Sequence, residues 1–134
     1  MRPLRVAIGL HPGYAAAVCA FAVDALYLAV IARQGDGIDD RVVFVAASIL
    51  AAGVAAATAE GVGTVAAGVA ASWAVATLWI WVLLGVFSIG LVVVPAAIFA
   101  TVALIRRHAA SPVTAAGIAL GVLTAAAGLA LTPA

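Results

Sequence analysis

Apolar residues fill long stretches of this chain, and short polar or glycine-rich segments separate them. The first stretch covers residues 14–32 and is interrupted only by Asp24. The polar segment 33–41 follows, and its glycines and aspartates favour a loop over a helix interior. A second apolar stretch covers residues 42–59 and stops at Glu60. This pattern predicts at least two long helices joined by a hydrated loop.

The next region, residues 64–105, contains no charged side chain. It is far longer than the roughly 17 to 25 residues that one membrane span needs, so we expect it to fold back once. Two glycines and a serine within 85–90 place the turn there. Arg106 and Arg107 then end the fourth apolar stretch.

The last apolar stretch follows Ser111 and Pro112, residue types that are favoured at the start of a helix. The sequence therefore predicts an all-α polytopic membrane bundle, a single transmembrane domain over residues 1–134. Its five expected spans are about 14–33, 42–59, 64–84, 89–105 and 113–131. Four spans are the alternative, if 64–105 holds one long helix and a re-entrant or interfacial piece.

Composition supports membrane insertion and excludes several classes of function. Hydrophobic residues make up 68% of the chain and charged residues 8%, whereas soluble domains are about half apolar and a quarter charged. The six arginines form no basic cluster, so we expect no binding to nucleic acid. One cysteine and two histidines give no metal-ligand spacing, and catalytic motifs are missing. We therefore expect no enzyme, no metal and no cofactor.

The charges also predict an orientation. With the N-terminus and its Arg2 and Arg5 inside, Arg106 and Arg107 also lie inside and the aspartate-rich loop lies outside, which follows the positive-inside rule. Five spans then place the C-terminus outside. Because lysine and asparagine are absent and alanine and valine abound, a GC-rich bacterial genome is indicated. The expected location is multi-pass in the cytoplasmic (inner) membrane of such a bacterium.

Asp24 is the first candidate for a functional residue, because a carboxylate at the centre of a bilayer costs about 2.5 to 3.5 kcal/mol. Tyr27 lies three residues later on roughly the same helix face and could donate a hydrogen bond to it. One interpretation is a proton or cation coupling site in a small transporter. The favoured interpretation is structural: a protonated or hydrogen-bonded Asp24 pins its helix through Ser48, Ser72 or Thr77. A shifted span with Asp24 at the interface is a third.

The remaining charged side chains are expected near water. Glu60 falls at a turn, where a solvated carboxylate is the common case. His11 and His108 map to the predicted inner boundary. The three aspartates of segment 33–41 supply too few oxygens for a dedicated cation site, so a hydrated acidic loop is expected.

Small and aromatic residues suggest packing roles in the later spans. Gly117 and Gly121 form a GxxxG step that Gly128 extends, and such faces allow helices to approach closely in lipid. Trp79 and Trp81, just before the turn at 85–90, are expected to anchor the end of the third span at the membrane interface. This glycine face is expected to meet either another span of the same chain or another subunit.

Two functions follow from these features. The favoured one is an accessory or structural subunit that lies in the lipid bilayer and packs against a membrane-protein partner or against copies of itself. The alternative is a small proton-coupled transporter or channel that uses Asp24.

Overall fold

The described part of the chain forms five long helices. The computed structural model describes residues 11–35, 37–85, 90–107 and 111–132. The helices are α2 (Pro12–Gln34), α3 (Asp40–Ala59), α4 (Val65–Leu84), α5 (Gly90–Arg107) and α6 (Ser111–Leu131). All five are long and apolar enough to cross a membrane, by length and composition. The predicted all-α bundle with five spans is confirmed, and each predicted boundary lies within two residues of the observed one.

Some sequence predictions fall on parts of the chain that the structure does not describe. These are residues 86–89 of the turn between α4 and α5, together with Arg2, Arg5, Asp36 and His108.

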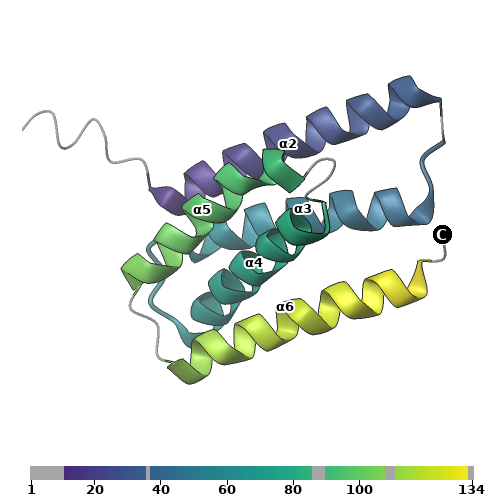
Figure 1. Ribbon diagram of the computed structural model, residues 1–134. Coiled ribbons are helices and arrows are strands. Elements are labelled where there is room, and N and C mark those ends of the chain that lie inside the picture. The colour runs from purple at the N-terminus through teal and green to yellow at the C-terminus, as the bar shows by residue number, and fades with distance from the viewer. Residues whose placement is uncertain (1–10, 36, 86–89, 108–110, 133–134) are drawn as a thin grey trace, which may run out of the picture.

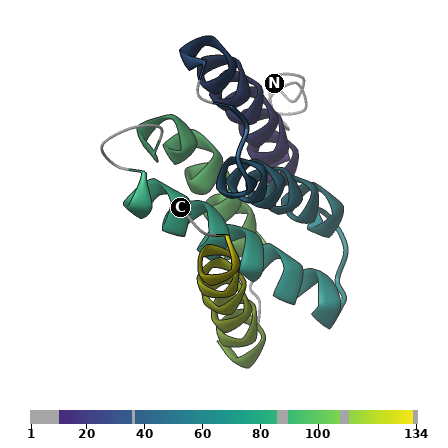
Figure 2. The same ribbon diagram turned by 90° about the vertical axis from the view of Figure 1, so that its right-hand side faces the viewer.

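Four of the helices surround a shared core, and the fifth lies outside it. α2 packs against α3 and α5, and α4 packs against the other side of both. α6 packs mainly on α4, and its described residues make no substantial contact with α2 or α5 (Figures 1 and 2). The bundle is therefore a four-helix core with one peripheral helix, and α6 has the smallest buried share of the five spans.

Residues at the ends of α2 and α3 explain why the sequence predicts the position of the first loop correctly. α2 begins at Pro12. Proline has no backbone N–H, and the first turn of a helix has no intrahelical acceptor for one. The helix is followed by its C-cap Gly35, which has the left-handed conformation with φ 76°. α3 begins after Asp39, whose side chain accepts a hydrogen bond of 2.8 Å from the Val42 amide. An N-cap of this kind satisfies a donor that the first helical turn leaves free.

Small side chains allow the helices to approach closely. The fully buried residues of the core are mostly alanines: Ala16, Ala20, Ala52, Ala74, Ala96 and Ala97. A methyl group added at Gly53 would lie 2.9 Å from the Cβ of Ala20, so α2 and α3 are in close contact there. In lipid, such packing rather than hydrophobic exclusion holds helices together. The alanine-rich composition therefore has a structural reason.

Candidate functional sites

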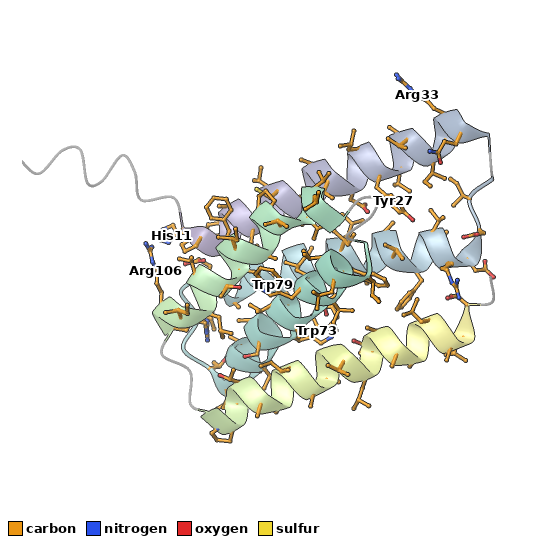
Figure 3. The ribbon with its side chains drawn as sticks, in the orientation of Figure 1. His11, Tyr27, Arg33, Trp73, Trp79 and Arg106 are labelled. Atoms are coloured by element: carbon orange, nitrogen blue, oxygen red, sulfur yellow. The ribbon has the colours of Figure 1, made fainter. Side chains whose placement is uncertain are left out.

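Asp24 lies near the middle of α2 and inside the bundle. Only 3% of its surface is exposed, and its Oδ1 atom is buried without a hydrogen-bond partner among the described residues. Tyr27 is half-buried one turn later in the same helix (Figure 3), and no hydrogen bond joins the two side chains in the part of the chain described. A buried polar atom without a partner is costly, so this carboxyl group calls for an explanation.

The hydroxyl groups expected to hold Asp24 are directed elsewhere. Ser48 donates to the Val45 carbonyl at 2.8 Å and accepts from the Trp81 indole at 2.8 Å. Ser72 donates to a carbonyl one turn back in its own helix. The Thr77 hydroxyl is buried and has no partner among the described residues. None of these three groups bonds to Asp24 in this structure.

Glu60 joins the end of α3 to the start of α2. Its Oε2 accepts a hydrogen bond of 2.5 Å from the Gly13 amide, and its Oε1 lies 3.5 Å from Nδ1 of His11. His11 occupies the N-cap of α2 but makes no capping bond with its side chain. Glu60 therefore caps α2 from another helix, and its carboxylate sits where the helix dipole favours negative charge.

Glu60 lies at the predicted turn and is partly accessible to solvent, with 16% of its side chain exposed, but its role as a cap of α2 was not predicted from the sequence. Gly13 makes the contact possible, because any side chain there would meet the Glu60 carboxylate and the Ala56 backbone. One feature of the sequence could have indicated this contact. The helix that starts at Pro12 and Gly13 is not preceded by Ser, Thr, Asp or Asn, so its cap has to come from elsewhere in the chain.

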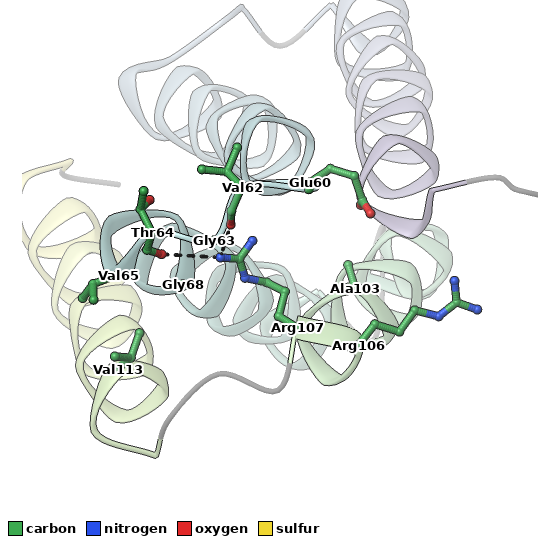
Figure 4. Close-up of a pocket in the computed structure, with 11 residues that line it drawn as sticks. Glu60, Val62, Gly63, Thr64, Val65, Gly68, Ala103, Arg106, Arg107 and Val113 are labelled. Carbon is green, nitrogen blue, oxygen red and sulfur yellow. Dashed lines mark hydrogen bonds between the residues drawn. The ribbon is translucent and has the colours of Figure 1, made fainter.

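Arg107 makes the complementary contact from the end of α5. Its guanidinium donates to the carbonyls of Ala59 and Val62, the latter at 2.6 Å, and reaches the Thr64 carbonyl at 3.5 Å (Figure 4). A cation at the last carbonyls of α3 matches the negative end of that helix. Together, Glu60 and Arg107 tie the α3–α4 loop to α2 and α5.

A cavity of about 510 Å³ opens beside this loop. It lies between the start of α4, the end of α5 and the first turns of α6, and Arg106, Arg107 and Thr64 contribute polar groups to its wall (Figure 4). The Arg107 guanidinium is already bonded to loop carbonyls, whereas the Arg106 side chain extends away from the bundle in Figures 3 and 4. The chemistry at this end is dominated by helix capping.

A second cavity lies within the span region, between α3, α4 and α6. Its volume is about 220 Å³, and its wall carries three aromatic rings from Phe44, Trp73 and Trp81. Most polar groups of the wall are paired: the Trp73 indole donates to Thr124 at 3.0 Å, and the Trp81 indole donates to a serine of α3. The exception is the Thr77 hydroxyl.

The glycine face of α6 packs within the same chain. Methyl groups added at Gly117 or Gly121 would meet α4, the first 2.6 Å from the Val69 carbonyl oxygen and the second 2.7 Å from the Cβ of Ala76. One added at Gly128 would overlap the Phe44 ring of α3. These glycines therefore set the position of α6 on the core.

The two tryptophans expected at an interface differ in their surroundings. Trp79 is exposed on α4 and its indole donates to Thr101 of α5 at 3.0 Å. Trp81 is only 6% exposed, lies in the core, and packs edge-on against Phe44 with ring centroids 6.0 Å apart. Trp81 is two residues further along the helix and faces inward, so its ring contacts other helices instead of a headgroup layer.

Among the described residues, no three His, Cys, Asp or Glu side chains gather in a group that could hold a metal ion. No protein family, no curated protein and no solved structure matches the chain.

Proposed function

We propose that this multi-pass membrane protein is an accessory or structural subunit that packs against another membrane protein or against copies of itself. The observation that carries the proposal is the position of α6, which contacts the core through its glycine face and leaves its other side uncovered. That outer side exposes the alanines Ala115, Ala119, Ala126 and Ala130 on both sides of the larger Leu123, which is 65% exposed. Small outward residues permit the close helix approach on which association in lipid depends.

The interior also supports a structural role over transport. Among the described residues, the buried polar side chains are Asp24, Ser72 and Thr77, and no hydrogen bond links any of them to another. Proton and ion pathways through membranes use connected polar groups or water-filled cavities. The alanine-packed core offers no such connection in this part of the chain.

Association can be tested on the outer side of α6. Replacing Ala115 and Ala119 together by leucine should abolish recovery of the stoichiometric partner, or of the homo-oligomer, in native mass spectrometry after mild extraction from the original host. Ala22→Leu, on the exposed side of α2, is the matched control and should leave the assembly intact. A monomer without partner from the unmodified chain contradicts the proposal.

For the location, we propose the cytoplasmic membrane of a bacterium, with the N-terminus inside. Arg106 and Arg107 lie at the same end of the bundle as His11, and Arg33 lies at the opposite end (Figure 3). The acidic residues Asp39 and Asp40 begin α3 at the Arg33 end. Arg41 also lies at that end, so the described arginines divide equally between the two ends. The proposed orientation therefore rests on Arg2 and Arg5, which the sequence adds to the N-terminal side and which give that side the excess of arginine that the positive-inside rule requires.

A second candidate function rests on Asp24. A mid-span carboxyl group with an unpartnered buried oxygen has the character of a proton-coupling site, because such groups are costly and commonly functional in membranes. Asp24→Asn keeps the shape but cannot exchange a proton. If the protein couples transport to protons, this variant should lose proton-driven uptake in proteoliposomes while folding normally. Uptake equal to that of the unmodified protein contradicts the coupling role, and Tyr27→Phe is the neighbouring control.

A further inference from the structure

We propose that the cavity between α3, α4 and α6 is a binding site for a compact aromatic ring that carries a carbonyl oxygen. This site is separate from Asp24 and from the outer side of α6, so it stands independently of the proposed subunit role.

The size of the cavity fits one ring with a short substituent. An apolar cavity of about 150 Å³ in a protein interior accommodates benzene. The present cavity measures about 220 Å³ and has walls from three helices. Its dimensions therefore suit a substituted single ring better than a long chain.

The wall is built for a flat ligand. Phe44 and Trp81 already meet edge to face, and Trp73 lines the same space from α4. Aromatic side chains favour offset or edge-to-face contacts with further rings. The indole N–H groups of both tryptophans are held by Ser48 and Thr124, which fixes the ring orientations without a ligand.

Thr77 supplies the polar specificity. Its side chain is 2% exposed, its hydroxyl has no partner among the described residues, and it belongs to the cavity wall. A threonine hydroxyl can donate one hydrogen bond, and threonine in a helix divides between two side-chain rotamers. A carbonyl oxygen on the ligand would provide the acceptor that the protein leaves out.

The route into the site is through the lipid phase. The cavity is partly open, and α6 is the helix with the least coverage by the rest of the bundle. Where α6 passes α3, Gly128 lies against the Phe44 ring, so the aromatic wall and the peripheral helix meet at one end of the cavity. A ligand that partitions into the membrane can therefore reach it from the side.

The test compares acetophenone with cumene, two ligands of similar shape of which only the first carries a carbonyl oxygen. The purified full chain in detergent micelles is used in a Trp79→Phe background, so that both remaining tryptophans line the cavity. Acetophenone binding is followed by quenching of their fluorescence, and cumene binding by its competition with acetophenone.

Thr77→Val should weaken acetophenone binding about fivefold, which is the effect of one hydrogen bond, and leave cumene binding unchanged. Ala125→Leu narrows the cavity and should weaken binding of both ligands, whereas Ala22→Leu, on the exposed side of α2, should change neither.

Circular dichroism and gel filtration identify any variant that fails to fold. An unchanged ratio of the two affinities in a folded Thr77→Val variant would overturn the proposal. Undiminished binding in a folded Ala125→Leu variant would overturn it too, because the ligand would then lie elsewhere.

Discussion

At the residue scale, two charged side chains, Glu60 and Arg107, stabilise helix ends. Glu60 places negative charge at the start of α2, and Arg107 places positive charge at the end of α3. Both contacts satisfy backbone groups that a helix terminus leaves free, which is important near a bilayer where water is scarce. The α3–α4 loop is consequently held by bonds from both neighbours.

Replacing Arg107 should loosen this loop. Arg107→Gln removes the charged donor from three carbonyls and should lower the free energy of unfolding by about 2 kcal/mol, the scale of hydrogen bonds to charged groups. Arg106→Gln is the matched control, because its side chain is exposed and should cost less than about 0.5 kcal/mol. Thermal or SDS-titrated unfolding in detergent measures both. Equal losses in the two variants would contradict the capping role.

Residue roles were predictable from sequence only where a local signal existed. Asp24 stands out because a charge within an apolar span is rare, and the structure places it inside the bundle. The hydrogen bond between Glu60 and Gly13 joins residues that are 47 positions apart, so no local sequence pattern predicts it. Trp81 lies near the end of α4, which suggested a place at the membrane interface. Its side chain is on the inward face of that helix, however, so it packs in the core.

At the element scale, the helices were predictable because charge and turn residues mark their ends. Asp39 and Gly35 bound the first loop, and Arg106 and Arg107 end α5. The helix faces that point into the bundle were not predictable in the same way, since alanine, valine and leucine occur on all faces of every helix. A span bordered by lipid shows little of the polar and apolar contrast that orients a helix in a soluble protein.

The docking of α6 onto α4 should depend on its glycines. Gly117→Ala places a methyl group 2.6 Å from the Val69 carbonyl oxygen, a contact with backbone that a rotamer change cannot relieve. The variant should lose about 1 to 3 kcal/mol of stability through overpacking, despite the better helix propensity of alanine. Gly37→Ala has open space around it and should be close to neutral. Unfolding in detergent compares them, and a stabilised Gly117→Ala variant would contradict the packing described.

At the scale of the whole molecule, five helices of similar length form a four-helix core with α6 outside it. The number of spans followed from sequence length and hydrophobicity, because 64–105 is too long for one crossing. Which helices are neighbours did not follow, because that depends on contacts between residues distant in the chain, such as Gly117 with Val69. Because each span crosses the membrane once, successive loops lie on alternate sides, and an odd number of spans places the two ends of the chain on opposite sides.

Cysteine accessibility tests this arrangement most directly. In a Cys19→Ala background, single cysteines are introduced by Gly37→Cys and Gly63→Cys, at exposed loop positions with open space on either side of α3. A membrane-impermeant maleimide should label position 37 in intact cells and position 63 only after permeabilisation. Labelling of both positions from the same side would contradict the five-span membrane bundle.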